Sequence, residues 1–321
     1  MKDKKIQILR GIAIIAVVAI HTVRGGYISI IIRPFINFAV AMFIFLSGYL
    51  TKIEDKNLTI GIFNKKRILR VMIPYIIWSI IYTIAYSNYK KFFVKILTGT
   101  NCGIYYYILV YIQLVLITPF VIKLVKSKYK NIGFVITPIF MLIYYLIVII
   151  LKKEIPFPLN ANNFIIWFVY YYLGITLGNK QIVIKNIKNI KIVVVISLVL
   201  QIFEGIFWNK LGYYGMATTQ LKYTSMISNI LILFLTFFWL SNGKEIEDKR
   251  WKNYLIEIGG MSFGIYLSHI LILDIFNKFI FYWRNIVFPL NTIIVILVNC
   301  MCIIIGRKIL GNKFSRFLGL Y

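Results

Sequence analysis

Charged residues are scarce in this chain of 321 residues, and acidic residues are scarcer still. Only 15% of the residues are Asp, Glu, Lys or Arg, whereas a water-soluble domain contains about 25%. The chain has 10 acidic side chains against 37 Lys and Arg, which gives a formal net charge of +27. Hydrophobic residues make up 60% of the sequence and aromatic residues 17%. This composition excludes most classes of soluble domain.

Cysteine is also rare, and a cleavage signal is missing. Cys102, Cys300 and Cys302 have neither the spacing of a metal site nor that of a disulfide framework, so we expect no bound metal. The first apolar segment contains Arg10 and His21 and lacks a small-residue cleavage site, which excludes a cleavable signal peptide. We find no internal repeat and no soluble domain at either end. Residues 1–321 are therefore expected to form a single integral-membrane domain.

Long apolar runs are what the chain does contain. A stretch of about 18 or more apolar residues with few charges is typical of a membrane-spanning helix. The runs predict an all-α, polytopic bundle of about ten transmembrane helices, over residues 6–23, 30–50, 71–87, 104–125, 132–151, 163–178, 190–208, 223–241, 259–278 and 287–305.

The basic residues predict how this bundle is oriented. With the N-terminus in the cytoplasm, 25 of the 37 Lys and Arg fall on the inner side and 11 on the outer side, while Arg10 lies within the first span. This bias agrees with the positive-inside rule for a protein of the cytoplasmic membrane with both termini cytoplasmic. It also explains the net charge through contact with the anionic lipid bilayer, so we expect no nucleic-acid partner.

Ionisable side chains inside a membrane are costly, which makes each of them a candidate for function. Both of the chain's histidines belong to this group. The candidates are Arg10, His21, Arg67, Arg70, Glu204, His269 and Asp274.

Arg10 and His21 are predicted to share one helix face. They are eleven residues apart, which corresponds to three turns plus about 20° and to about 16 Å along the axis. The first span thus carries a cation near the inner surface and a titratable ring deeper in the membrane. The alternative is an arginine that extends to the interface and a histidine that bonds to a neighbouring helix.

Arg67 and Arg70 lie one turn apart where the third span begins. Pro74 has no N–H group, so the carbonyl of Arg70 loses its helical partner and the helix is expected to loosen there. Two neighbouring guanidinium groups can bind phosphates bidentately. The alternative is an ordinary positive-inside anchor.

Three other candidates lie in the later spans. His269 and Asp274 are expected to point about 140° apart, so they form no His–carboxylate pair on one face. His269 is either a second site residue or a packing contact. Glu204 and Asp274 lie toward the outer ends of their spans, where each could bind sugar hydroxyls or pair with a nearby lysine.

Aromatic and small residues are interpreted as structural. The runs 105–107 and 170–172 consist of tyrosine, which favours an interfacial belt over a surface that stacks on a sugar. Ser47 and Gly48 are expected to allow close helix packing, although a serine could also accept an acyl group.

Four motifs in order resemble the integral-membrane acyltransferase family 3. They are Arg10 with His21, FIFLSGYL at residues 43–50, RILR at residues 67–70 followed by Pro74, and MSFGIYLSHILI at residues 261–272. The ten-span layout is also similar, so the resemblance covers essentially the whole chain.

The resemblance implies transfer of an acyl group, usually acetyl from acetyl-CoA, to a hydroxyl of a cell-surface carbohydrate. It also implies that Arg10, His21, Arg67 and Arg70 are essential. Some members carry an extracytoplasmic esterase-like domain that completes the transfer. This chain is expected to lack one, and therefore to acylate its acceptor directly or to pass the group to a separate extracytoplasmic acyltransferase.

The predicted geometry agrees with this chemistry. Arg10, Arg67 and Arg70 are on the cytoplasmic side, where the polyphosphorylated donor acyl-CoA is found. His21 is deeper and suits a general base, because an imidazole titrates near pH 6.5. The expected acceptor is an envelope or exopolysaccharide glycan or its lipid-linked precursor. The alternative function is a polysaccharide or glycolipid transporter or flippase, although the two halves show no symmetry.

Overall fold

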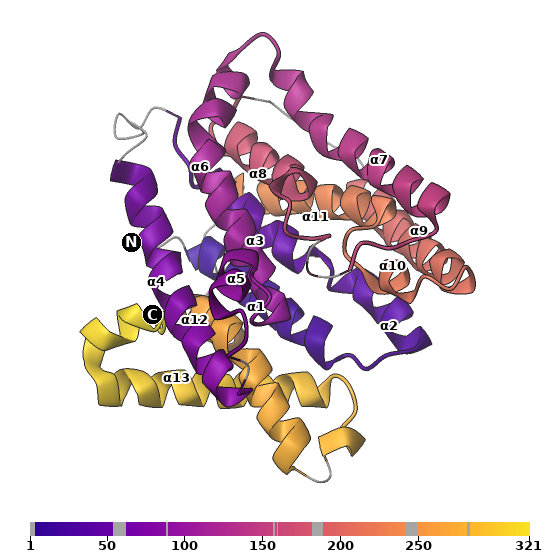
Figure 1. Ribbon diagram of the computed structural model, residues 1–321. Helices are drawn as coiled ribbons and strands as arrows, with labels where there is room; N and C mark the ends of the chain where they lie inside the picture. Colours follow the sequence, from indigo (N-terminus) through magenta and orange to yellow (C-terminus); the bar gives the residue numbers. More distant parts are fainter. Residues whose placement is uncertain are drawn as a thin grey trace.

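A computed structural model describes residues 4–53, 62–87, 89–156, 158, 160–181, 189–241, 249–280 and 283–321, without the side chains of residues 62–64, 284 and 312. All regular structure in these ranges is helical (Figure 1). The α-helices are α1 (Lys4–Thr22), α2 (Tyr27–Ile32), α3 (Phe38–Tyr49), α4 (Ile62–Ala85), α5 (Phe92–Thr98), α6 (Tyr106–Lys126), α7 (Ile136–Leu151), α8 (Phe164–Gly178), α9 (Ile190–Lys210), α10 (Tyr214–Thr218), α11 (Tyr223–Ser241), α12 (Arg250–Phe279) and α13 (Leu290–Phe317). Short 3₁₀ turns are η1 (Arg33–Phe35), η3 (Gly103–Tyr105), η4 (Lys130–Phe134) and η5 (Trp283–Asn285).

The predicted all-α membrane bundle is confirmed. Eight helical segments of the described chain are long and apolar enough to cross a membrane. Two further apolar helices, α7 and α8, are shorter, with 16 and 15 residues. Every predicted span coincides with one of these ten segments, whereas the number of actual crossings stays a prediction.

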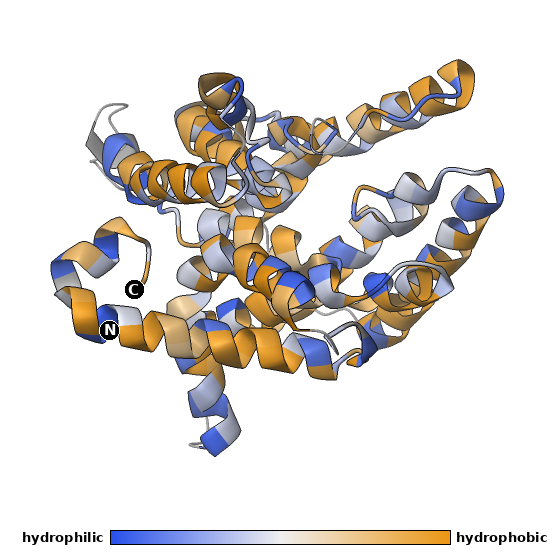
Figure 2. Ribbon diagram, turned by 60° about the horizontal axis from the view of Figure 1, so that its bottom comes forward, coloured by the Kyte–Doolittle hydropathy of each residue, from blue (hydrophilic) through white to orange (hydrophobic). Residues whose placement is uncertain are grey.

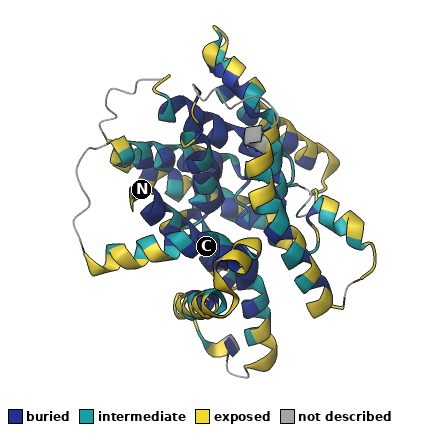
Figure 3. Cartoon of the chain, turned by 90° about the vertical axis from the view of Figure 1, so that its left-hand side faces the viewer, coloured by how far each residue is buried: buried dark blue, intermediate teal, exposed yellow. Residues whose placement is uncertain are grey.

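Apolar side chains cover the outside of the bundle as well as its inside. Helices α7, α9 and α13 expose large apolar residues, for example Leu146, Phe203 and Leu297. Figure 2 shows the long helices coloured hydrophobic over most of their length, and Figure 3 shows the buried residues at the centre of the molecule. An apolar outer surface costs little in a bilayer, because the surrounding lipid chains are themselves apolar. We therefore describe the protein as a multi-pass membrane protein.

The second predicted span is not one continuous helix, which corrects the sequence analysis. Helix α2 ends at Ile32, the 3₁₀ turn η1 follows, and α3 starts at Phe38. Pro34 explains the break, since proline removes one backbone donor and disfavours helix in the residue before it. The break turns the side chain of Arg33 into the protein, where it is half-buried. By contrast, α4 continues through Pro74.

Helix α1 lies in the middle of the bundle and packs most extensively on α12. Two glycines allow this approach. A Cβ atom on Gly11 would lie 2.4 Å from the carbonyl oxygen of Leu255, and one on Gly259 would lie 1.9 Å from that of Gln7. The two helices run in the same direction, because the start of α1 lies against the start of α12 and their histidines also meet. Small residues permit such close helix contacts in membranes.

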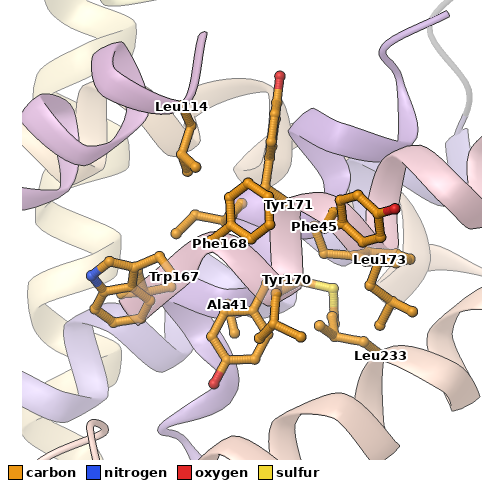
Figure 4. Close-up of a cluster of buried hydrophobic side chains, with 14 of the residues drawn as sticks. Ala41, Phe45, Leu114, Trp167, Phe168, Tyr170, Tyr171, Leu173 and Leu233 are labelled. Carbon is orange, nitrogen blue, oxygen red and sulfur yellow. The ribbon is translucent and has the colours of Figure 1, made fainter. Parts of the chain in front are cut away.

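Helices α3 and α8 form the second close pair. A Cβ atom on Gly48 would lie 2.3 Å from the carbonyl oxygen of Tyr171, and one on Gly174 would lie 2.3 Å from that of Phe45. The packing role expected for Gly48 is thereby confirmed. Figure 4 shows the aromatic side chains of α8 among apolar residues of α3, α6 and α11. The tyrosines at 170–172 are buried there, so the predicted interfacial belt is wrong for this run.

Both ends of the described chain lie at one end of the bundle (Figure 1). Helix α13 bends at Gly311, where φ is +69°, and the last residues turn back toward α4 and α12. There Trp78 donates a hydrogen bond of 3.0 Å to the carbonyl of Leu318, and Arg307 donates one of 2.9 Å to that of Leu320. Tyr321 thereby lies near Arg10 of α1.

Candidate active site

A cavity of about 910 Å³ runs through the centre of the bundle, and most of the sequence-predicted residues line it. Arg10 and His21 both face it, as the spacing along α1 predicts, and so do Arg67 and Arg70 of α4. A volume of this size is typical of a site for one organic ligand. Glu204, Asp274 and His269 are not among the lining residues.

One end of the cavity, called the arginine end, is formed by Arg10, Arg67, Arg70, Tyr111 and Tyr321. Tyr111 is close enough to Arg67 and Arg70 for their charges to act on it, and the charges of Arg70 and Arg10 act on Tyr321. Helices α1, α4 and α6 and the chain end supply these residues, and they meet only through the tertiary fold.

The guanidinium of Arg67 is anchored at the C-terminus of α3. It donates hydrogen bonds of 3.0 Å to the hydroxyl of Thr51 and of 3.4 Å to the carbonyl of Ser47. Arg70 is one turn further along α4 and is exposed. The first arginine is thus held in place, and the second has freedom to adapt to a ligand.

Tyr321 adds a neutral hydroxyl to this end. Burial raises the pKa of its phenol above the ordinary value, and the charges of Arg70 and Arg10 offset only part of that rise. The side chain therefore remains protonated at neutral pH and can donate a hydrogen bond to a ligand.

The opposite end, called the histidine end, is lined by His21, Arg33, Glu154 and Gln220, and His269 lies behind His21. The rings of His21 and His269 lie side by side, with centroids 5.3 Å apart and planes tilted by 48°. His21 is half-buried and lines the cavity, whereas His269 is fully buried behind it. The structure brings together the two histidines that the sequence placed 248 positions apart.

Arg33 was missed by sequence reasoning, which counted it only among the 11 basic residues of the outer side. It lines the cavity and donates hydrogen bonds of 3.2 Å to the carbonyls of Ile20 and Thr218. Its Nε atom is buried without a hydrogen-bond partner. The Arg-Pro pair was a usable signal, because irregular backbone at membrane depth normally lines a cavity.

Glu154 and Gln220 were missed as well. The Oε1 atom of Glu154 accepts a hydrogen bond of 3.1 Å from the backbone N–H of Met216, and its carboxylate packs against Gly215. Gln220 donates from Nε2 to the hydroxyl of Tyr106 at 2.5 Å, while its Oε1 atom is buried without a partner. Both residues lie between spans, where no periodicity indicates which side chains turn inward.

Glu204 and Asp274 hold helices together instead of facing the cavity. Glu204 accepts hydrogen bonds from the hydroxyl groups of Tyr145 and Thr224, from the backbone N–H of Thr224 at 3.0 Å, and from the indole of Trp208 at 3.3 Å. Asp274 accepts a hydrogen bond from the hydroxyl of Tyr86. These contacts join α7 and α11 to α9, and the residue that follows α4 to α12. We therefore do not retain the two carboxylates as acceptor-binding groups.

The charge of the cavity is one-sided. Four arginines and a single acidic residue, Glu154, occur among the described residues that line it. Such a surface attracts anions. Within the same described ranges, no group of three or more His, Cys, Asp or Glu side chains is arranged to hold a metal ion.

Comparison with known proteins agrees with the resemblance. The sequence profile of the acyltransferase domain of family 3 matches residues 3–307. Among curated proteins, the chain is 24% identical over 310 residues to the probable poly-β-1,6-N-acetyl-D-glucosamine export proteins of Staphylococcus aureus strains Mu50 and MSSA476, a match that covers 89% of this chain and 83% of each relative. No solved structure matches the chain significantly. Since the family profile spans nearly all of the sequence, the chain belongs to acyltransferase family 3 and is a membrane acyltransferase.

Proposed function

We propose that the protein is an O-acyltransferase that moves an acyl group, in the first instance acetyl, from cytoplasmic acyl-CoA to a hydroxyl of an envelope or exopolysaccharide glycan or its lipid-linked precursor. One observation carries the proposal. A single cavity is lined at one end by Arg10, Arg67 and Arg70 and at the other by His21. The proposal requires an orientation in the cytoplasmic membrane with the arginine end, and both chain ends, facing the cytoplasm.

The arginine end suits the phosphates of coenzyme A. Guanidinium groups bind phosphate oxygens bidentately and keep their charge when partly buried. We assign Arg67 and Arg70 to the donor, together with Arg10. Because Arg10 lies about 16 Å from His21 along α1, we place its charge at the phosphates and not at the reacting carbonyl. An extended pantetheine arm is long enough to span that separation.

His21 is proposed as the general base. It accepts the proton of the acceptor hydroxyl while the oxygen forms a bond to the acyl carbon. The carbon–sulfur bond then breaks, and the departing thiolate takes the proton back from His21. Coenzyme A leaves as the thiol, the acceptor becomes an ester, and His21 returns to its starting state. The reaction therefore needs no covalent intermediate between the acyl group and the enzyme.

The histidine end suits a carbohydrate acceptor. Sugar hydroxyls both donate and accept hydrogen bonds, and this end offers one unpartnered donor atom on Arg33 and one unpartnered acceptor atom on Gln220. Glu154 adds a carboxylate that lines the same space. The name of the relatives, which concerns a β-linked N-acetylglucosamine polymer, supports a glycan acceptor.

Glycan export is the second candidate, and the name of the relatives favours it. The family argues for transfer instead, because the profile that matches residues 3–307 is that of an acyltransferase domain. A relay to a separate extracytoplasmic acyltransferase differs from direct transfer only in the acceptor.

The deciding experiment uses the purified full chain in lipid vesicles with radiolabelled acetyl-CoA. Transfer of label to an added envelope glycan, dependent on His21, is the expected result. Movement of glycan across the vesicle membrane without acetyl-CoA, together with no transfer of label, would establish export instead. Label that appears only after a separate extracytoplasmic acyltransferase is added would establish the relay.

A further inference from the structure

The hydrogen-bond partners of one ring nitrogen of His269 determine which nitrogen carries the hydrogen. Its Nδ1 atom lies 2.9 Å from the carbonyl oxygens of both Ile265 and Tyr266. Carbonyl oxygens only accept hydrogen bonds, so Nδ1 carries the hydrogen. The Nε2 atom of the same neutral ring therefore presents a lone pair.

No donor among the described residues forms a hydrogen bond with that lone pair. Nε2 of His269 is buried and has no hydrogen-bond partner among the described residues. The Tyr266 ring packs against His269 with centroids 6.4 Å apart, but its hydroxyl donates to the carbonyl of Ile104, and the hydroxyl of the adjacent Ser268 bonds to Gly264 and Asn299. A buried acceptor without a donor is rare in folded proteins and calls for an explanation.

The ring of His21 is the neighbour able to supply the donor. It lies 5.3 Å from the ring of His269, centroid to centroid, on the two helices whose close approach Gly11 and Gly259 allow ten residues earlier. Because a ring nitrogen lies off the ring centre, two imidazoles at this separation reach hydrogen-bond distance when an N–H of one points at the lone pair of the other. His21 also lines the cavity.

A catalytic histidine normally needs such a partner. In hydrolase triads a carboxylate holds the histidine in one tautomer and stabilises the imidazolium that forms. Here the acidic residue that lines the cavity is Glu154, and its carboxylate is bound to Met216 and packed against Gly215. The cation Arg33, whose charge acts on His21, cannot accept a hydrogen bond.

We propose that His269 is the positioning residue of the reaction, with its Nε2 lone pair accepting a hydrogen bond from His21. This inference rests on the proposed function. The hydrogen bond fixes the tautomer and rotamer of His21, and it stabilises the imidazolium that exists between proton uptake from the acceptor hydroxyl and proton release to the thiolate. His269 keeps its own hydrogen on Nδ1 throughout, so the proton balance of the reaction is unchanged.

Two substitutions separate this role from simple packing. His269→Gln removes the ring but keeps an acceptor oxygen at a similar reach. His269→Phe keeps an aromatic ring against His21 but removes the acceptor. The measurements are kcat and the KM for acetyl-CoA with the full chain in lipid vesicles.

We expect His269→Phe to lose about 10²-fold in kcat, at the lower end of what general-base catalysis contributes, with the KM for acetyl-CoA unchanged. His269→Gln should recover at least a tenfold part of that loss. Equal activity of the two variants, or higher activity of His269→Phe, would overturn the proposal. If the wild-type chain transfers no acyl group, the proposed function is wrong, and the inference about His269 is then wrong as well.

Nuclear magnetic resonance of the wild-type chain tests the tautomer without any substitution. The chain has two histidines, so ¹⁵N-histidine labelling yields four ring signals, which His269→Gln assigns. We expect a protonated Nδ1 and a hydrogen-bonded, unprotonated Nε2 for His269. A hydrogen on Nε2 of His269 would refute the inference even if the enzyme is active.

Discussion

The two ends of the cavity are built on different principles. The arginine end combines three guanidinium groups with two tyrosines, and Arg70 remains exposed there. The histidine end is enclosed, with His269 fully buried and Arg33 bonded to two backbone carbonyls. Charge attracts a ligand over several ångströms and tolerates small displacements, whereas proton transfer requires hydrogen-bond distance. The difference supports the proposal that one end binds the donor and the other carries out the reaction.

The largest expected effect is at the histidine end. Replacing His21 with alanine removes the proposed general base, whose loss typically costs about 10²- to 10⁴-fold in rate. We expect His21→Ala to abolish measurable acyl transfer while donor affinity, measured by equilibrium binding of acetyl-CoA, stays at the wild-type value. If His21→Ala transfers acyl groups at the wild-type rate, the division of the cavity into a binding end and a reacting end is wrong.

The contact between α1 and α12 is expected to support the histidine end. A Cβ atom on Gly259 would lie 1.9 Å from the carbonyl oxygen of Gln7, whereas one on Gly260 would meet nothing within 4 Å. Gly259→Ala should therefore overpack the contact at a cost of about 1–3 kcal/mol and reduce kcat. Gly260→Ala is the matched control and should change neither thermal unfolding nor kcat. Equal effects of both substitutions would contradict this account of the packing.

The arginine end should respond in KM and not in kcat. Arg67→Lys and Arg70→Lys keep the charge but lose the planar fork, so each should raise the KM for acetyl-CoA by about tenfold, which corresponds to about 1.4 kcal/mol. Lys66→Ala is a control on the same helix, because Lys66 is exposed and does not line the cavity. If Lys66→Ala weakens donor binding as much as Arg70→Ala does, the arginines act only through net charge.

The smallest expected effect concerns the acceptor. Glu154→Gln keeps an oxygen to accept the hydrogen bond from Met216 but removes the charge that lines the cavity. We expect the KM for the glycan to rise about threefold to tenfold, in line with about 1 kcal/mol for one hydrogen bond, while the KM for acetyl-CoA stays constant. Asp274→Asn, outside the cavity, should leave both constants unchanged. An effect of Asp274→Asn alone would restore that carboxylate as the acceptor ligand.

The sequence predicts the membrane bundle and one half of the site for local reasons. Apolar runs of sufficient length identify spans wherever they occur, so all ten segments were found. A spacing of eleven residues on one helix places Arg10 and His21 on the same face, and a spacing of three does so for Arg67 and Arg70. Both pairs line the cavity, whereas their roles stay predictions.

Other features were decided by the tertiary structure alone. The meeting of His21 with His269 depends on the glycine contact between α1 and α12, which no single segment encodes. Glu204 had the same intramembrane signature as a binding carboxylate, yet its neighbours on α7 and α11 satisfy it.

The sequence by itself therefore determined the helices, their apolar character and the faces on which each carries its polar groups, because these follow from residues a few positions apart. Only the tertiary structure decided which faces meet. It turned Arg33 and Glu154 inward and Asp274 away from the cavity, because contacts between distant segments depend on how closely the backbones approach and on where proline interrupts a helix.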